Sequence, residues 1–303
     1  MVMNLNFNSL RIRMIENYIA QIYSSDKIQS PVHLSNGQEA ISVGVCAALE
    51  RADLVFGTYR GHALYLAKGG SLKRMMAELY GKRTGCGGGK SGSMHLSAKE
   101  MGVMGVSAIV GSTIPHAVGA AYAAKLKKLN QVVVCFFGEG STNEGVYHES
   151  LNFAAMHQVP LLLICENNGL AIFTKERDTN SYQVVEHAGA YGIPAQHCSF
   201  GADAEQVSVI AKENIAAIRA GSGPRLIEFK TFRYKQHVGP GDHLYLGEAA
   251  KEEYNEWISQ DPLMSISGFE DEVLKIELEI QKAVEFAEES DFPSVEDLYT
   301  DVY

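Results

Sequence analysis

Residues 131–169 read QVVVCFFGEGSTNEGVYHESLNFAAMHQVPLLLICENNG. The first segment, 131–137, is a β-branched and aromatic run without polar alternation, which predicts a strand buried on both faces. A glycine turn follows, then a helical pattern over 145–157 and a second apolar run over 160–165. Strand, helix and strand in this order predict a βαβ unit, whose two strands run parallel with a right-handed crossover.

The same alternation continues on both sides of this unit. Apolar residues recur at three- and four-residue steps from Leu10 to Tyr23, which indicates an amphipathic helix. Further helices are expected at 38–49, 71–80, 113–129, 182–191, 204–220, 249–257 and 269–288, and further strands at 196–200 and 225–231. We therefore expect an α/β fold of three layers, in which a mostly parallel sheet has helices on both faces.

Two segments lack a regular pattern. Residues 56–62 are polar and aromatic, and we expect an irregular connection there. Residues 81–112 are dense in glycine but also contain Met, Val and Ile side chains, which a solvated linker would avoid. We therefore expect an ordered loop over 81–112.

The length of 303 residues allows one large α/β domain with extensions. We expect a single domain over 1–303, with an N-terminal helical extension at 1–36. A second helical extension is expected at 249–303, where an acidic composition favours a layer that faces another subunit.

The charge balance excludes two classes of partner. Lys and Arg number 26 and Asp and Glu number 36, for a net charge of −10, so neither a nucleic-acid-coating nor an anionic-membrane surface is expected. The five cysteines show no CxxC spacing, and the apolar runs are too short to span a membrane. We expect a soluble cytoplasmic protein.

The turn at 138–145 has the chemistry of an anion site. Its glycines let the backbone approach a ligand closely, and the N–H groups at a helix start favour phosphate. The spacing matches neither a P-loop nor the dinucleotide-binding GxGxxG. Glu139 would repel phosphate at such a site unless a cation lay between them.

Asn168 supplies a second oxygen ligand for that cation. It follows the next predicted strand, so parallel pairing brings it to the same sheet edge as Glu139. A hard divalent ion takes carboxylate, amide and carbonyl oxygens together with phosphate. The tripeptide 167–169 alone reads as an ordinary turn; combined with the glycine turn across one βαβ unit, it becomes a specific signal.

These two elements resemble the thiamine diphosphate motif, in which Gly-Asp-Gly is followed after a fixed gap by Asn-Asn. More narrowly, the chain resembles the alpha subunits of 2-oxo acid dehydrogenase decarboxylating components, the pyruvate, branched-chain and acetoin dehydrogenase group, and is closest to the acetoin type. The likeness runs from about Gly37 to about His237. It is carried by GQEA at 37–40, YRGH at 59–62, MMAELYG at 75–81, GSMH at 92–95, IVG at 109–111, the turn at 138–145, ENNG at 166–169 and Arg233-Tyr234.

The resemblance implies thiamine diphosphate and Mg²⁺ as cofactors and assigns residues to them. Glu139, Asn168 and the carbonyl of Leu170 would hold Mg²⁺. The other implied cofactor contacts are the amides of Gly140 and Ser141 and the side chains of Tyr59 and Arg60 at the diphosphate, the backbone of Ala108 and Val110 at the aminopyrimidine, and His237. Arg60 suits this position because a guanidinium fork matches phosphate oxygens.

His237 is also the implied catalytic residue, near the reacting carbon, where a histidine serves as acid or base close to neutral pH. His62 and His95 lie in matched motifs, and their roles stay open. The remaining seven histidines show no spacing that binds a metal or orients a nucleophile, and we expect structural roles for them.

The resemblance implies partners as well. The family forms heterotetramers of two alpha and two beta chains, with the cofactor between them, and passes an acyl unit to a lipoyl-bearing acyltransferase. The substrate would be a 2-oxo acid or acetoin. This chain would then supply half of each active site.

Two residues depart from the family pattern. Glu139 stands where relatives have Asp, and Lys235-Gln236 precedes His237 where many relatives carry His-Gly. These departures keep two alternatives open, a thiamine diphosphate-dependent carboligase or biosynthetic enzyme on this scaffold, and a non-catalytic assembly subunit.

Overall fold

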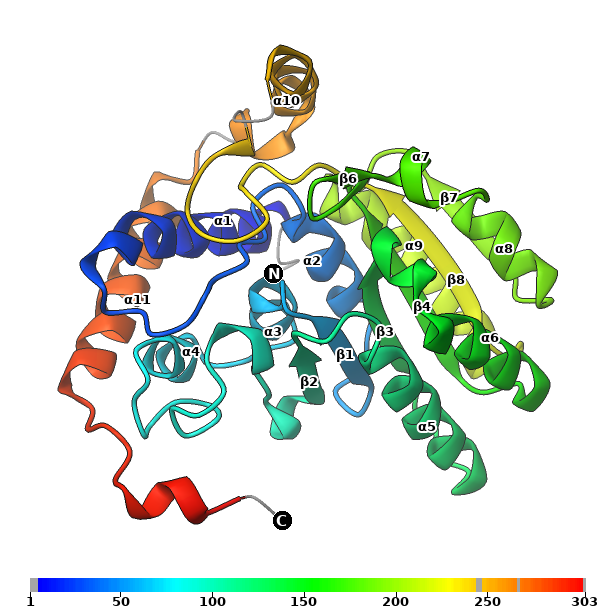
Figure 1. The fold of residues 1–303 in the computed structure, drawn as a ribbon, viewed down its shortest axis with the longest axis horizontal. Helices are drawn as coiled ribbons and strands as arrows, with labels where there is room; N and C mark the ends of the chain where they lie inside the picture. The colour runs from blue at the N-terminus through cyan, green and yellow to red at the C-terminus, as the bar shows by residue number, and fades with distance from the viewer. Residues whose placement is uncertain (1–4, 244–246, 266–267, 302–303) are drawn as a thin grey trace.

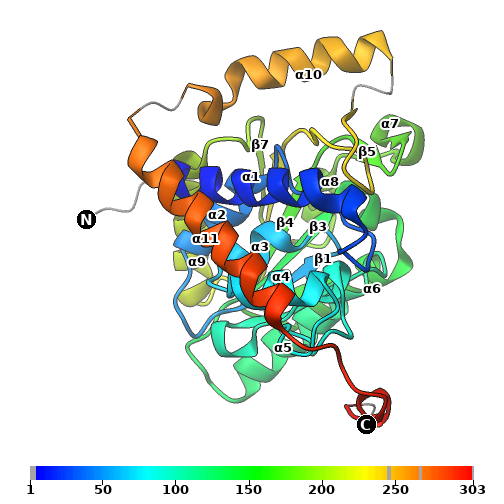
Figure 2. The ribbon, with the colours of Figure 1, turned by 90° about the vertical axis from the view of Figure 1, so that its left-hand side faces the viewer.

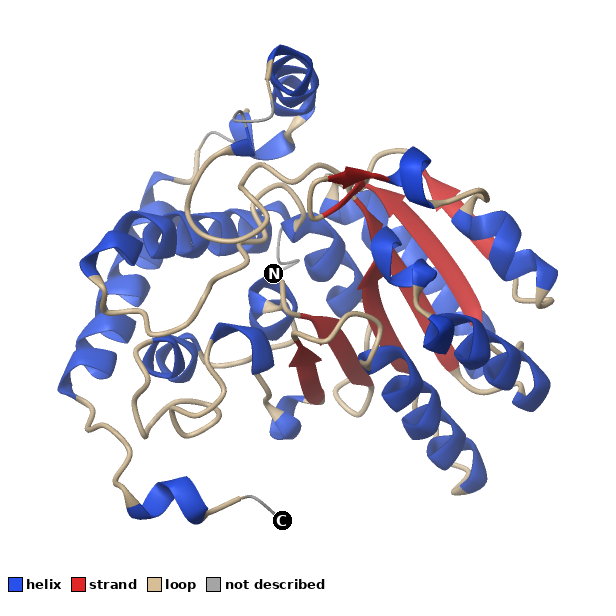
Figure 3. Ribbon diagram, viewed as in Figure 1, coloured by secondary structure: helices blue, strands red, loops and turns tan. Residues whose placement is uncertain are grey.

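The computed structural model describes residues 5–243, 247–265 and 268–301. Its centre is a sheet of six strands in the order β2-β1-β3-β4-β8-β7, in which every neighbouring pair is parallel (Figures 1 and 3). The strands are β1 (Leu54–Thr58), β2 (Val103–Ser107), β3 (Val133–Gly138), β4 (Leu161–Asn167), β7 (Ala195–Cys198) and β8 (Arg225–Lys230). The predicted α/β fold is confirmed.

The βαβ unit at 131–169 forms as predicted. Strands β3 and β4 pair in register from Val133 with Leu161 to Gly138 with Glu166. Helix α6 (Gly145–His157) connects them. Because the two strands end level with each other, the residues that follow them emerge side by side at one edge of the sheet.

Strands β1 and β2 were not predicted. The expectation of an irregular connection over 56–62 is wrong for its first residues, which belong to β1 (Leu54–Thr58), and β2 lies inside the glycine-rich segment 81–112. Both strands are only five residues long and carry glycine, which weakens a strand on its own. Strand β1 is stabilised by parallel partners on both sides, β2 and β3.

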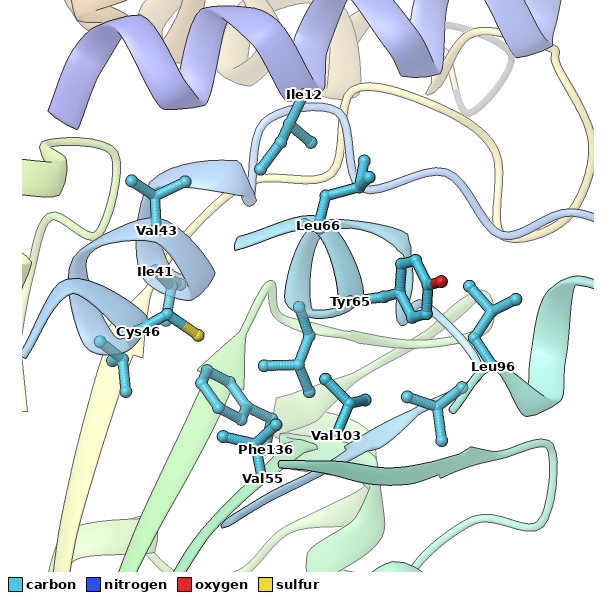
Figure 4. Close-up of a cluster of buried hydrophobic side chains, with 14 of the residues drawn as sticks. Ile12, Ile41, Val43, Cys46, Val55, Tyr65, Leu66, Leu96, Val103 and Phe136 are labelled. Atoms are coloured by element: carbon cyan, nitrogen blue, oxygen red, sulfur yellow. The ribbon is translucent and has the colours of Figure 1, made fainter. Parts of the chain in front are cut away.

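Helices cover both faces of the sheet, as expected (Figures 1 and 2). Alternate strand residues face two separate hydrophobic cores. The first core, part of which Figure 4 shows, packs α1 (Leu5–Ile22), α2 (Glu39–Ala47), α3 (His62–Ala67), α4 (Leu72–Leu79), α9 (Ala204–Arg219) and α11 (Glu270–Glu289). The second packs α5 (Thr113–Leu126), α6 and α8 (Val184–Ala190).

The glycine-rich segment is ordered, as predicted, and one side chain explains part of that order. Glu78, at the end of α4, is 1% exposed. One of its carboxylate oxygens accepts the backbone N–H groups of Gly87 and Gly89 at 2.7 and 2.9 Å. The other accepts those of Ser91 and Gly92 at 2.7 and 3.0 Å. A single buried carboxylate thus organises the turn from 87 to 92.

The ends of the chain pack mainly on one side of the sheet. Helices α1 and α11 contact each other there, whereas α10 (Glu248–Gln260) lies at the edge of the molecule (Figure 2). Residues 1–4 of the expected extension at 1–36, and 266–267 and 302–303 of that at 249–303, lie outside the described residues. None of the described helices is both long and apolar enough to cross a membrane.

Candidate active site

The carboxyl ends of the strands surround a cavity of about 230 Å³. It lies between the neighbouring strands β1 and β3. The next strand after β1 in the chain, β2, lies on one side of this pair, and the next after β3, β4, lies on the other side. In open parallel sheets such a point, where the strand order reverses, is the usual ligand crevice. Residues that follow β1, β2, β3, β4 and β8 all line the cavity.

Nearly all the residues predicted from sequence meet in this cavity. Its lining includes Tyr59, Arg60, Val110, Glu139, Gly140, Ser141, Asn168, Leu170 and His237. Ala108 does not line it and is half-buried directly after β2. The structure thus brings together residues that are up to 178 positions apart in the chain, as the predicted parallel sheet requires.

Glu139 has an incomplete set of hydrogen bonds. It is 2% exposed, and Oε2 accepts the backbone N–H of Asn168 at 3.3 Å. Oε1 is buried and has no hydrogen-bond partner among the described residues. Burial raises the pKa of this carboxyl to about 7. A buried carboxylate oxygen without a partner is costly, and a cation would remove that cost.

The two adjacent asparagines have different roles. The side chain of Asn167 is held on all sides, because Nδ2 donates to Glu176 and Glu228 and Oδ1 accepts from Lys230 and Gly169. Asn168 lines the cavity beside Glu139 instead. Asn168, and not Asn167, was predicted from the sequence as the cation ligand, and of the two it is Asn168 that lines the cavity.

The side chain of Asn168 makes two hydrogen bonds. Oδ1 accepts the backbone N–H of Leu170 at 3.1 Å, and Nδ2 donates to Oε1 of Gln38 at 3.0 Å. With Glu139 and the carbonyl of Leu170, the site therefore offers one carboxylate, one amide oxygen and one carbonyl. This is an oxygen set that suits a hard divalent cation. No group of three or more His, Cys, Asp or Glu side chains with a metal-binding arrangement occurs in the described part of the chain.

The turn after β3 begins as a 3₁₀ helix over Glu139–Asn143, and α6 starts only at Gly145. The helix begins at Gly145, as predicted, and the 3₁₀ segment forms the turn before it. There is no space for a side chain at Gly140, because a Cβ there would lie 2.8 Å from Cβ of Ala171. A larger residue would therefore push the β5 strand (Leu170–Ala171) away from the cavity.

Arg60 is buried without a carboxylate partner among the described residues. Its Nη1 donates to the carbonyl of Leu34 at 2.7 Å and Nη2 donates to that of His237 at 3.3 Å. Burial lowers the pKa of the guanidinium, although Tyr59 and Glu166 partly oppose this effect. A buried cation that contacts neutral carbonyls beside a cavity is suited to bind an anionic ligand.

His237 lies in a cluster of aromatic rings. Its ring centroid is 5.5 Å from that of Tyr59 and 5.1 Å from that of His33. Burial, together with the nearby charges of Arg60 and Arg233, lowers the pKa of His237 to about 4. The imidazole is therefore neutral at pH 7. Nη1 of Arg233, which can only donate, lies 3.5 Å from Nδ1 of His237, so Nδ1 is the acceptor and Nε2 carries the proton.

Sequence reasoning missed three residues of this region. His33 was expected to be structural, yet its ring packs 4.5 Å from Tyr59 and Nδ1 is buried without a hydrogen bond. Gln38 and Glu166 line the cavity. Burial raises the pKa of Glu166 to about 8. The sequence could have predicted Glu166 as a residue of the site, because it directly precedes Asn167 and Asn168.

The open question about His62 has a structural answer. The residue is fully buried, with Nδ1 at 3.0 Å from Glu16 and Nε2 at 2.7 Å from Ser93. Neither His62 nor His95 lines the cavity. The buried Glu16, His62 and Ser93 side chains therefore connect α1, α3 and the glycine-rich segment.

The carboxyl edge of this parallel sheet combines a cavity, a glycine turn and a buried arginine, which defines the class as an α/β protein with a ligand site at the ends of its strands. The model of the dehydrogenase E1 component family matches residues 8–297. The chain belongs to this family of thiamine diphosphate-dependent oxidoreductases. It is an alpha subunit of the type found in 2-oxo acid and acetoin dehydrogenases.

Two relatives illustrate the likeness. The alpha subunit of acetoin:2,6-dichlorophenolindophenol oxidoreductase from Bacillus subtilis is 37% identical over 97% of this chain and 91% of its own length. The chloroplastic pyruvate dehydrogenase E1 component subunit alpha-3 from Arabidopsis thaliana is 36% identical over 96% of this chain and 72% of its own length.

A solved structure shares the fold. Transketolase from Campylobacter jejuni superposes with a TM-score of 0.62 at 19% identity. The match covers 96% of this chain and 49% of that one, so the chain spans about half the length of the transketolase. At this identity the likeness concerns the fold alone.

Proposed function

We propose that Glu139, Asn168 and the carbonyl of Leu170 hold Mg²⁺ at the diphosphate of thiamine diphosphate. The observation that carries this proposal is the buried Oε1 of Glu139, which has no hydrogen-bond partner among the described residues. A cation bound there satisfies that oxygen and removes the repulsion between Glu139 and a phosphate. The longer side chain of Glu139 still reaches Asn168, as its hydrogen bond to that backbone N–H indicates.

The remaining diphosphate contacts come from two loops. The amides of Gly140 and Ser141 serve one side of the diphosphate, because the turn after β3 leaves them at the cavity. Tyr59 and Arg60 serve the other side, from the loop after β1. Arg60 supports this assignment because its positive charge is buried and meets only carbonyl oxygens among its hydrogen-bond partners in the described chain.

The backbone of Ala108 and Val110 contacts the aminopyrimidine in this proposal, since both follow β2 at the same edge. When bound, thiamine diphosphate supplies a nucleophilic carbon that attacks a carbonyl and accepts the electrons released when the adjacent C–C bond breaks. His237 is the proposed catalytic residue. Its neutral ring lies beside Tyr59 and His33, and its Nε2–H is the group that can donate a hydrogen bond or a proton to the substrate.

This chain supplies half of the proposed active site, and a beta subunit supplies the other half. Exposed apolar side chains support this arrangement, because Ile109 and Ile172 line the cavity mouth and are 70% and 51% exposed. We propose a heterotetramer of two alpha and two beta chains in the cytoplasm. Each alpha chain is one domain over 1–303 with extensions at 1–36 and 249–303, the second facing another subunit.

The proposed reaction cleaves the C–C bond next to the carbonyl of a 2-oxo acid or acetoin and passes the acyl unit to the lipoyl group of an acyltransferase component. The carboligase alternative gains no support from Lys235, which pairs with Asp242 at 2.8 Å and does not line the cavity. The non-catalytic alternative gains none from the cavity, where the implied ligand set is intact apart from Ala108.

Native mass spectrometry tests the cofactor and the partner together. The chain, isolated through a tag from its own cells with thiamine diphosphate and Mg²⁺ present throughout, is expected to carry both ligands and a second subunit. Incubation of that complex with lipoyl domain and a panel of 2-oxo acids and acetoin then tests the reaction. A chain without cofactor or second subunit would favour the non-catalytic alternative, and a cofactor-loaded complex that acylates no lipoyl domain would favour the carboligase.

A further inference from the structure

A short segment crosses the edge of the sheet and contacts three of the loops that form the site, those after β1, β4 and β8. We define residues 32–38, with the sequence VHLSNGQ, as the crossing segment. It lies between α1 and α2 and belongs to no helix or strand. Gly37 and Gln38 belong to the motif at 37–40, and Gln38 begins the helix expected at 38–49, but none of the residue roles assigned above uses this segment.

The first two contacts of the crossing segment hold the loop after β1. The carbonyl of Leu34 accepts from Nη1 of Arg60 at 2.7 Å. Oγ of Ser35 donates to the backbone carbonyl of Arg60 at 3.4 Å, and the backbone N–H of Ser35 donates to the buried Glu16 at 2.9 Å. Both ends of Arg60 are thus held by this segment.

Further contacts hold the loop after β8. The carbonyl of Asn36 accepts the backbone N–H of Tyr234 at 3.0 Å, and the carbonyl of Gly37 accepts from Oγ1 of Thr231 at 3.0 Å. Gly37 has a φ of +92°, and a Cβ there would lie 2.2 Å from the carbonyl oxygen of Phe232. The close approach of the two backbones therefore requires glycine.

The last contact reaches the loop after β4. Gln38 is 3% exposed, and Oε1 accepts from Nδ2 of Asn168 at 3.0 Å. The backbone N–H of Leu170 can only donate, so its partner on Asn168 is Oδ1 and the atom that faces Gln38 is Nδ2. With Nδ2 engaged by Gln38, Oδ1 is the atom that accepts from the N–H of Leu170 and is available to the cation site.

We propose that Gln38 is a positioning residue, which holds the amide of Asn168 in the orientation that presents Oδ1 to the metal ion. This inference rests on the proposed function, because it needs a cation at Glu139 and Asn168. Residues that orient a metal ligand in this way typically contribute about 10–100-fold to metal affinity. Without the acceptor on Gln38, Nδ2 loses its partner and the amide can rotate, which places a donor where the cation needs an acceptor.

The test measures Mn²⁺ binding to the complex purified through a tag on this chain, by electron paramagnetic resonance at saturating thiamine diphosphate. Gln38→Met keeps the length of the side chain and removes the acceptor, so Mn²⁺ affinity is expected to fall by about 10–100-fold. Gln38→Glu keeps an oxygen acceptor for Nδ2 and is expected to bind Mn²⁺ at least as tightly as wild type. Gln206→Met, an exposed position on α9, is the matched control and should change nothing.

A general structural role for Gln38 would weaken both Gln38 variants, so rescue by Gln38→Glu separates positioning from packing. If Gln38→Met lowers the melting temperature, Gln38→Ala replaces it, because it removes the acceptor without adding apolar volume. Unchanged Mn²⁺ affinity in the folded acceptor-free variant, or a loss in Gln38→Glu equal to that in Gln38→Met, overturns the inference. Wild type that binds Mn²⁺ no better than Glu139→Ala overturns the proposed metal site itself, which is a distinguishable result.

Discussion

Two buried glutamates in this chain have opposite surroundings. Glu78 uses both carboxylate oxygens to accept four backbone N–H groups of the turn at 87–92. Glu139 is buried to a similar degree, yet one of its oxygens has no partner among the described residues. A buried carboxylate whose two oxygens both accept hydrogen bonds from the chain stabilises the fold. A buried carboxylate in a cavity, with one oxygen that accepts no hydrogen bond, is suited to bind a ligand.

The same contrast exists between two arginines, the half-buried Arg13 and the buried Arg60. Arg13 forms ion pairs with Glu39 and Asp261, so its charge is balanced within the chain. Arg60 donates only to carbonyl oxygens in the described structure. By this comparison, Arg13 and Glu78 belong to the structural framework, and Arg60 and Glu139 belong to the site.

The largest expected effect is on Glu139. Glu139→Ala should reduce Mg²⁺-dependent retention of thiamine diphosphate by about 100-fold or more, because the metal loses its only carboxylate from this chain. Glu139→Asp keeps a carboxylate at this position and should retain the cofactor. Retention is measured by native mass spectrometry of the purified complex. Equal retention in Glu139→Ala and wild type would break the comparison.

Glu78 should show the converse result. Glu78→Ala leaves four backbone N–H groups without an acceptor, and we expect a loss of about 3–5 kcal/mol in the free energy of unfolding. This corresponds to a fall in melting temperature of roughly 10 °C for a chain of this size. Differential scanning calorimetry measures it. The variant that still folds should bind the cofactor with the affinity of wild type; a selective loss of cofactor binding without loss of stability would contradict the account.

The arginines sharpen the comparison at a smaller scale. Arg60→Lys removes the guanidinium fork and should weaken cofactor binding by about tenfold, the equivalent of about 1.4 kcal/mol. Its melting temperature in the absence of cofactor should change little. Arg13→Lys should lower the melting temperature and leave cofactor affinity unchanged, because its partners lie in the framework. Isothermal titration calorimetry measures the cofactor affinity of both variants, and thermal melts measure their stability. Weaker cofactor binding in Arg13→Lys together with a lower melting temperature in Arg60→Lys would refute the assignment of Arg60 to the site and Arg13 to the framework.

Histidines of the site should contribute the smallest effect, through pH. Burial lowers the pKa of His33 to about 3 and that of His237 to about 4, below the ordinary value of 6.5. The unfolded chain therefore binds more protons between pH 4 and pH 6.5, so the stability from these neutral rings is complete above pH 6.5 and is lost as the pH falls toward 4. The loss at pH 5 should be about 1 kcal/mol per histidine, because both rings are partly solvated.

Burial raises the pKa values of Glu139 and Glu166, so these two residues change the pH dependence of stability in the direction opposite to the histidines. Their contribution to stability is present at low pH and is lost as the pH rises through 7 to 8. A difference measurement isolates the histidines. Guanidinium denaturation at pH 7.5 and pH 5.0 is compared between wild type and the variant with both His33→Gln and His237→Gln. The variant should lose less stability on acidification, and parallel losses would show that the two rings are not held neutral.

The sequence was sufficient to predict the βαβ unit and the meeting of Glu139 with Asn168, because long apolar strands and parallel register determine both. Strands β1 and β2 were missed because each is five residues long and contains glycine, so their stability comes from neighbours rather than from local pattern. Gln38 and His33 were missed for a similar reason. Gln38 lines the cavity and His33 packs against Tyr59, and both lie in the segment between α1 and α2, whose path is determined by contacts with distant loops.

The most direct test of the central claim is a set of melting curves for wild type, Glu139→Gln and Glu78→Gln, each with and without thiamine diphosphate and Mg²⁺. A ligand that binds only the folded state raises the melting temperature by an amount that grows with the logarithm of its affinity. The account predicts that the ligands raise the melting temperature of wild type and of Glu78→Gln but not that of Glu139→Gln. An equal rise in Glu139→Gln would contradict it.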